Sequence, residues 1–103
     1  MNPKTAKTLA KTLLPEAKLW IRRSSTNLDS EIEQTVAACL MDLGVVGIKK
    51  IDEEDPLIQQ AAKLYLKAQF GSDGKAERWE MFYERLKSAL ALSGEYTMEA
   101  SDG

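Results

Sequence analysis

The stretch from residue 52 to residue 96 constrains the fold most, because it holds two helical patterns in succession. Asp55 is a good N-cap, and Pro56 suits the first helical position, where its missing N–H costs nothing. Gly71 is expected to end this helix in the left-handed conformation. Between them, apolar residues recur at steps of three and four, as one broad stripe made of Leu57, Ile58, Ala61, Ala62, Leu64, Tyr65 and Ala68.

A second helix is predicted over residues 75–93, after a short polar turn, and Gly94 is expected to end it. We expect Trp79, Phe82 and Leu86 in the core. Charged side chains lie mostly on the opposite side of this helix. Because the two helices have matching stripes and a short connection, they are predicted to form an antiparallel hairpin over Pro56–Gly71 and Lys75–Ser93.

Two further helices are predicted near residues 12–23 and 28–43, packed on this hairpin. Gly44 is expected to end the second of them. The abundance of Ala, Leu, Lys and Glu favours helices, and 103 residues provide for one small domain. The predicted fold is therefore all-α, a small four-helix bundle built on a long antiparallel helical hairpin. The inner face of the 28–43 helix is expected to consist of Leu28, Ile32, Thr35, Val36, Cys39, Leu40 and Leu43.

The two ends of the chain carry opposite charge, although the net charge is only −2. Residues 1–23 hold six basic side chains and one acidic one, whereas residues 93–103 hold three acidic and no basic side chains. The sequence predicts a flexible basic arm over 1–11, a helical domain over 12–94 and a flexible acidic tail over 95–103. The charged ends are either solvated or meet between neighbouring subunits. The net charge argues against a general nucleic-acid binder.

Several classes of chemistry are missing from the sequence. It contains no His and a single Cys, which excludes imidazole catalysis and zinc-finger spacing. Cys39 is interpreted as a buried small hydrophobe. The acidic run 52–55 lacks the spacing of a calcium loop, and no glycine-rich phosphate loop occurs. We therefore predict no enzyme, no cofactor and no metal.

The sequence also lacks signals for a membrane or for secretion. No apolar run approaches the ~18 residues of a membrane span, and no signal-peptide core follows the N-terminal lysines. The single Cys fits a reducing cytoplasm.

A set of residues is predicted to lie at an interaction surface. Trp20 is interpreted either as a cover for the end of the bundle or as an exposed interface residue. The apolar residues of the 45–55 connection either tuck under the bundle or form an extended segment for a partner. The acidic tail is either frayed or orders on assembly. The complete candidate interface is Lys4, Lys7, Lys11, Trp20, Arg22, Arg23, Val46, Ile48, Ile51, Glu95, Tyr96 and Met98.

Two sequence patterns resemble a known family. They are D-P-L-I-x-x-A-x-x-L-Y-x-K-A-x-F-G, beginning at Asp55, and E-R-x-x-x-x-Y-E-x-L-K-x-x-L-x-L-S-G-E-Y, ending at Tyr96. Over residues 12–96 the chain resembles the head–tail connector (portal adaptor) proteins of long-tailed phages and prophages. The likeness is a whole-domain pattern and includes no catalytic signature.

The resemblance implies a structural subunit that assembles into a ring below the portal, extends the DNA channel and provides a platform for tail attachment. The implied partners are the portal protein, the next connector or tail protein and further copies of the chain, with at most passive contact to channel DNA and no membrane. It implies a place at the head–tail interface of the virion, and in the host bacterial cytoplasm during assembly. The alternative is a small helical regulatory or protein-binding module that acts as a monomer or dimer.

Overall fold

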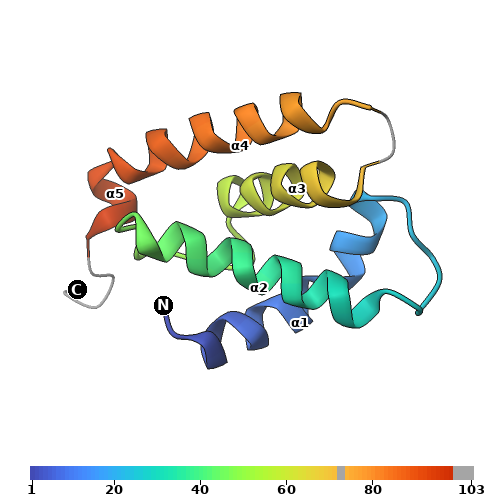
Figure 1. Ribbon diagram of the computed structural model, residues 1–103. Coiled ribbons are helices and arrows are strands. Elements are labelled where there is room, and N and C mark those ends of the chain that lie inside the picture. The colour runs from blue at the N-terminus through green and yellow to red at the C-terminus, as the bar shows by residue number, and fades with distance from the viewer. Residues whose placement is uncertain (72–73, 99–103) are drawn as a thin grey trace.

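The computed structural model describes residues 1–71 and 74–98, and all regular elements within them are helices. Helix α1 packs on α2 and α3 packs on α4, while α2 and α1 both contact α3 (Figure 1). Successive long helices run in opposite directions, so the predicted all-α bundle with an antiparallel α3–α4 hairpin is confirmed. The elements are α1 (Pro3–Trp20), α2 (Asp29–Val45), α3 (Pro56–Phe70), α4 (Ala76–Ala91) and the short α5 (Gly94–Thr97).

The centre of the core lies between α2 and α3. Five of the seven residues predicted for the inner face of α2 are completely buried, namely Ile32, Val36, Cys39, Leu40 and Leu43, whereas Leu28 and Thr35 are partly buried. On α3 the buried set is Ile58, Ala61, Ala62, Leu64 and Leu66. Leu66 lies outside the predicted stripe, and it is buried because α3 contacts α4 on one side and α1 and α2 on others. Burial of each large aliphatic side chain contributes about 1.5–3 kcal/mol.

Helix α1 corrects the prediction for the N-terminus. It begins at Pro3 instead of near residue 12, with the Asn2 side chain accepting a hydrogen bond from the Thr5 N–H at 2.8 Å. Residues 3–11 are therefore helical, and Ala6 and Ala10 are completely buried in the core. The buried residues of this segment are alanines, which bury little area each, and Leu9 is only partly buried, so the periodicity is weak in the sequence. Residues 1–11 are thus part of the bundle and not a separate arm.

The C-terminus of α2 also differs from the prediction. Gly44 lies within α2, and the left-handed residue is Gly47, with φ of +96°. The N–H of Ile48 donates to the carbonyl of Leu43, and the N–H of Gly47 donates to that of Gly44, which are the two bonds of a Schellman motif. Leu43 and Ile48, which hold the positions of the apolar pair in this motif, are both buried in the core. The left-handed conformation predicted for Gly71 is also wrong, because its backbone is extended, with φ of −66°.

Helix α4 packs with a narrower face than predicted. Tyr83 and Leu90 are buried, and Trp79 and Leu86 are partly buried against the core. Phe82 is 37% exposed, so its predicted place in the core is wrong. The physical reason is that α4 lies at the edge of the bundle and packs mainly on α3, with a few side-chain contacts to α2, so only one narrow stripe is covered.

Candidate assembly interface

A polar network joins α2 to α4 across the edge of the core. The hydroxyl of Tyr83 donates to the Asp42 carboxylate at 2.7 Å, and the Lys87 ammonium donates to the same oxygen at 2.9 Å. Lys87 also pairs with Glu84 at 3.2 Å. The Cys39 thiol lies 3.8 Å from the Tyr83 hydroxyl, which it reaches as a weak donor. These contacts fix the position of α4 relative to α2.

The protonation states of this network suit a structural bridge. Burial raises the pKa of the Cys39 thiol to about 12, and the hydrogen bond with Tyr83 offsets only part of that effect. Burial also raises the pKa of Tyr83 far above its ordinary value. For Asp42, burial acts upward, but the hydrogen bonds from Lys87 and Tyr83 outweigh it and hold the pKa of that carboxyl below its ordinary value. Cys39 is therefore a protonated core residue at neutral pH, as predicted, and not a nucleophile.

A second set of contacts holds α5 on the 46–55 connection. The buried Tyr96 donates its hydroxyl to the Asp55 carboxylate at 2.9 Å, and its backbone carbonyl accepts from the N–H groups of Lys49 and Lys50. Lys50 also pairs with Glu95 at 3.2 Å. Asp55 simultaneously caps α3 through the Leu57 N–H at 2.9 Å, so the predicted cap is confirmed. Tyr96 is thus part of the core and is not available at a surface, contrary to its inclusion among the interface residues.

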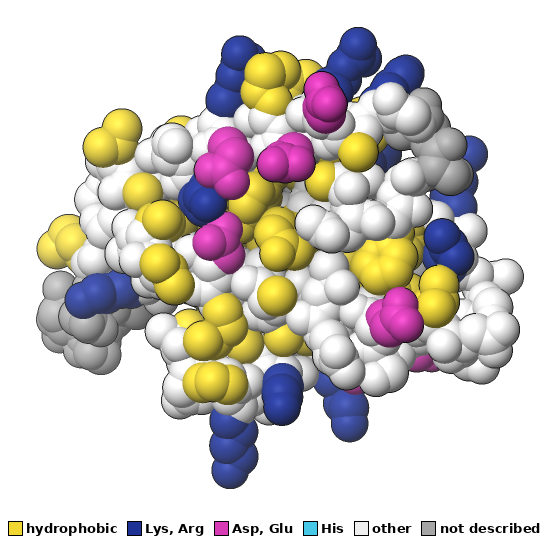
Figure 2. Space-filling model, in the orientation of Figure 1, with side chains coloured by type: hydrophobic (Ala, Val, Ile, Leu, Met, Phe, Trp, Pro, Cys, Tyr) yellow, Lys and Arg dark blue, Asp and Glu magenta, His cyan; other side chains and the backbone are white. Residues whose placement is uncertain are grey.

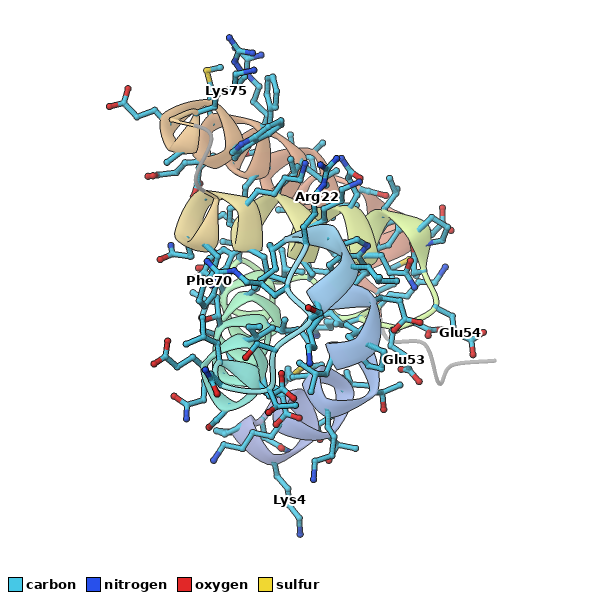
Figure 3. All side chains as sticks on the ribbon, turned by 90° about the vertical axis from the view of Figure 1, so that its right-hand side faces the viewer. Lys4, Arg22, Glu53, Glu54, Phe70 and Lys75 are labelled. Carbon is cyan, nitrogen blue, oxygen red and sulfur yellow. The ribbon has the colours of Figure 1, made fainter. Side chains whose placement is uncertain are left out.

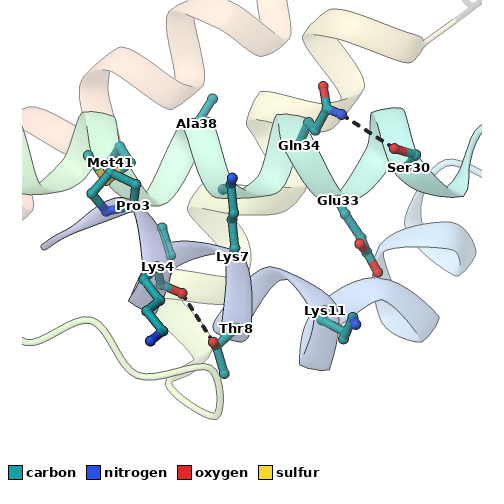
Figure 4. A pocket seen from close by; sticks show the side chains of 12 residues that line it. Pro3, Lys4, Lys7, Thr8, Lys11, Ser30, Glu33, Gln34, Ala38 and Met41 are labelled. Carbon is teal, nitrogen blue, oxygen red and sulfur yellow. Dashed lines mark hydrogen bonds between the residues drawn. The ribbon is translucent and has the colours of Figure 1, made fainter.

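The N-terminal lysines form one rim of a groove between α1 and α2 (Figure 4). Lys4, Lys7 and Lys11 are exposed and follow one side of α1, at steps of three and four residues. Ala38 and Met41 of α2 contribute to the apolar lining of the groove. The groove has a volume of about 820 Å³, and its opposite rim holds Ser30, Glu33 and Gln34. The three lysines of the predicted flexible arm therefore form a row of positive charges on the helix α1.

A second groove lies on the same face, between α2, α3 and α4, with a volume of about 480 Å³. Figure 2 shows Asp and Glu side chains gathered around one basic side chain in the upper part of the face, with further basic side chains projecting along its lower edge. The charged residues of the groove are Asp42, Glu80, Glu84 and Lys87, and its apolar lining is Ala38, Met41, Val45, Tyr65, Ala68 and Tyr83. One face of the molecule therefore has a basic side and an acidic side, with α2 between them.

The remaining basic residues of the N-terminal part do not join the α1 row. Lys18 pairs with Asp29 at 2.9 Å. Arg22 and Arg23 follow α1 at the far end from Lys4, as Figure 3 shows for Arg22. Arg22 has φ of 57° and occupies the left-handed position of another Schellman motif, formed by the Arg23 N–H to the Lys18 carbonyl.

The apolar residues of the predicted interface have mixed positions. Trp20 and Ile51 are partly buried and pack against the core. Ile48 is 1% exposed, so it belongs to the core and is not available as an interface residue, because its side chain completes the Schellman motif of α2. Val46 and Met98 are exposed. The connection thus tucks under the bundle through Ile48 and Ile51 and leaves Val46 at the surface. Residues 99–103 of the predicted tail, and the turn residues 72 and 73, lie outside the described part of the chain.

The acidic run 52–55 has a local structural explanation. Asp52 accepts a hydrogen bond from the Glu54 N–H at 2.9 Å, and Asp55 caps α3. Glu53 and Glu54 point outward from the connection (Figure 3). Among residues 1–71 and 74–98, no group of three or more His, Cys, Asp or Glu side chains converges as a metal site, and no helix there is long and apolar enough to cross a membrane.

Comparison with known families decides between the possible roles of this bundle. The model of the phage connector proteins matches residues 14–97, from within α1 to the end of α5. The chain belongs to the phage connector protein family. Comparisons with curated proteins and with solved structures find no match. The family match confirms the resemblance stated for residues 12–96, and it supports a structural role in the phage particle over an enzymatic one.

The sequence reasoning missed one exposed surface of this connector protein. Phe82 of α4 was predicted to lie in the core and Met81 was not assigned, yet Met81 is 45% exposed and Phe82 is 37% exposed. Arg78 and Arg85 lie at three- and four-residue steps from them and are also exposed. The sequence contained a sign of this surface, because two arginines lie three and four residues from the apolar pair and so share one side of the helix. It could be interpreted only once the face of α4 that packs on α3 was known.

Proposed function

We propose that this connector protein is a head–tail connector (portal adaptor) subunit that assembles into a ring below the portal. In that position it extends the DNA channel and provides a platform for tail attachment. The observation that carries the proposal is the family match over 14–97, which covers nearly the whole helical domain. Its partners in this role are the portal protein, the next connector or tail protein and further copies of itself, and its place is the head–tail interface of the virion.

The surface of the domain supports association with neighbours. A ring requires a heterologous interface, in which one face of a subunit meets a different face of the next. The lysine row on α1 and the acidic C-terminal segment are candidates for one such contact, although Glu95 already pairs with Lys50 of its own chain. Contacts between exposed charges are screened beyond about 8–10 Å at physiological salt. We therefore expect the isolated chain to associate weakly, and assembly to weaken as salt is added.

The test of the proposed function is assembly on the portal. The chain would be mixed with the portal protein of the same phage or prophage, or expressed alone as a control, and particles would be imaged by negative-stain electron microscopy. A ring of connector subunits bound to the portal is the expected result. A chain that stays a monomer or dimer and binds no portal would support the alternative of a small protein-binding module. Light scattering across salt concentrations then measures the electrostatic part of assembly.

A passive channel makes a separate prediction for DNA. Each phosphate neutralised by Lys or Arg adds salt-sensitive affinity, so a channel through which DNA slides should bind duplex weakly, with Kd no tighter than roughly 10⁻⁴ M at physiological salt. The α1 row is the surface most able to violate this expectation. Fluorescence anisotropy with a labelled duplex would measure it, using K4Q, K7Q and K11Q together as the variant. This variant keeps the helix, whereas deleting residues 1–11 would remove Ala6 and Ala10 from the core. Micromolar binding that the triple variant abolishes would contradict the passive channel.

A further inference from the structure

Four residues on the outer side of α4 form a ridge, defined here as Arg78, Met81, Phe82 and Arg85. Their spacing of three and four residues places them together on one face, with the apolar pair in the middle and an arginine at each end. Phe82 is held in place by the Trp79 ring, edge to face, with centroids 6.0 Å apart. A preordered aromatic side chain beside arginines is the composition typical of the energetically dominant part of a protein interface.

All four residues of the ridge are exposed, and no helix covers them within the described residues 1–71 and 74–98. The core-facing side of α4 is the side of Tyr83 and Leu90, and the ridge lies away from it. Within the described residues, neither Arg78 nor Arg85 has an ion-pair partner. The ridge therefore presents two unpaired positive charges and two large apolar side chains to solvent.

The second groove, between α2, α3 and α4, is called the acidic groove from here on, and it is complementary to the ridge in charge and in apolar surface. Its charged side chains carry three negative charges and one positive charge, a balance of −2 against the +2 of the ridge. Glu80 on its rim also lacks an ion-pair partner among the described residues. Val45, which is 80% exposed, and Met41 provide apolar surface in the groove, whose 480 Å³ accommodates an aromatic side chain.

We propose that the ridge of one subunit docks in the acidic groove of a second copy of this chain, with Phe82 against Met41 and Val45 and the two arginines near Glu80 and Glu84. The inference rests on the proposed function and specifies the contact between neighbouring subunits. The ridge and the groove are different surfaces, so each subunit uses its ridge on one neighbour and offers its groove to another. Such a contact is heterologous and propagates around a ring.

Cross-linking between two single-cysteine additions tests this contact. Ala38→Cys places a thiol in the groove, and Met81→Cys places one on the ridge while Phe82 is kept. The two proteins would be mixed and treated with a short bis-maleimide. The expected product is a mixed dimer, formed well above the level given by Met81→Cys with Gln60→Cys, an exposed control position on α3 outside both surfaces. The native Cys39 is completely buried and stays protonated, so wild-type protein serves as the blank.

Two further variants test whether the cross-link reports the proposed contact. Adding Phe82→Glu to the Met81→Cys chain should weaken the association by about 30-fold or more, as expected for loss of an aromatic anchor. The double variant Ala38→Cys with Met81→Cys should give a ladder of products larger than a dimer, because each copy then has both reactive surfaces. Products limited to a dimer would overturn the heterologous contact in favour of a two-fold one. Mixed dimers no more abundant than with Gln60→Cys would overturn the contact altogether.

The outcome is separable from that of the proposed function. Rings on the portal without the Ala38–Met81 product would leave the connector function standing and remove only this contact. Conversely, a specific Ala38–Met81 product with no binding to the portal in any condition would support a self-associating module and contradict the portal adaptor role.

Discussion

Gly44 and Gly47 give the sharpest test of the structure, because the local sequence and the tertiary fold assign them opposite roles. The sequence pattern places the helix-ending glycine at residue 44, whereas the structure places Gly44 inside α2 and Gly47 in the left-handed position. An alanine at 47 would adopt φ near +96°, beyond the usual left-handed well, which costs about 1–2 kcal/mol for an L-residue. No atom lies within 4 Å of the position its Cβ would take, so the loss is a backbone effect alone.

Alanine at 44 should act in the other direction. Glycine within a helix is destabilising by roughly 0.5–1 kcal/mol relative to alanine. The nearest atoms to the added Cβ would be the N and Cβ of Met1, at 3.4 and 3.5 Å, which are ordinary contacts at the end of the chain. Gly44→Ala should therefore stabilise the protein by about 0.5–1 kcal/mol, and Gly47→Ala should destabilise it by about 1–2 kcal/mol.

Urea unfolding followed by circular dichroism would measure both effects, provided that the dependence of the unfolding free energy on urea concentration is the same in the variants and in wild type. In thermal melts of a domain this size, each kcal/mol corresponds to a shift in Tm of about 4–8 °C, so the two variants should fall on opposite sides of wild type. Gly94→Ala is a matched control, since its Cβ would also meet open space and its φ is not left-handed. If Gly44→Ala lost stability while Gly47→Ala did not, the Schellman motif at Gly47 would be refuted.

Five other substitutions test the packing, the polar network and the backbone of the bundle by urea unfolding. Phe82→Ala should cost about 1 kcal/mol or less because that side chain is 37% exposed, whereas the completely buried Leu66→Ala should cost about 2–5 kcal/mol; equal losses would contradict the orientation of α4. Tyr83→Phe should cost about 1–2 kcal/mol through the lost hydrogen bond to Asp42, and an unchanged midpoint would show that this bond does not stabilise the fold. Asp42→Asn should cost about 1 kcal/mol at pH 7, since solvent screens this partly exposed pair. The pKa of Asp42 is lowered on folding, so its contribution is present above the ordinary value of 3.8 and is lost as the pH falls below it, through the folded-state pKa. The difference in stability between wild type and this variant should therefore narrow as the pH falls below about 4, and a difference that stays constant over that range would refute the assignment. Arg22→Gly should raise stability by about 0.5–1 kcal/mol, because Arg22 occupies a left-handed position at φ 57°, and a loss would mean that its side chain makes a stabilising contact.

The sequence by itself determined the features of this connector protein that depend on near neighbours in the chain. The spacing of apolar residues predicted the α3–α4 hairpin and the inner face of α2, since a helix brings residues three and four apart onto one side. Asp55 and Pro56 predicted the start of α3 for an equally local reason, because capping involves only the first turn. The order of residues from 55 to 96 was also sufficient to suggest the family.

Only the tertiary structure decided how much of each helical stripe is covered. A central helix such as α3 buries Leu66 beyond its predicted stripe, whereas the edge helix α4 leaves Phe82 at the surface, and the periodicity of either segment does not contain this difference. The alanines of α1 carry too little apolar area to signal burial, and Ala6 and Ala10 are buried only because the partner helices cover them.

The polar bridges were likewise decided by the fold. Tyr83 and Asp42 are 41 residues apart in the sequence, as are Tyr96 and Asp55, and no local pattern links either pair. A hydrogen bond requires its two groups to be within about 3 Å, and for residues so distant in the chain only the packing of whole helices can bring them there. The local sequence therefore indicated the four long helices, although not the first turns of α1 or the short α5, and the packing of those helices determined which of their faces remain exposed.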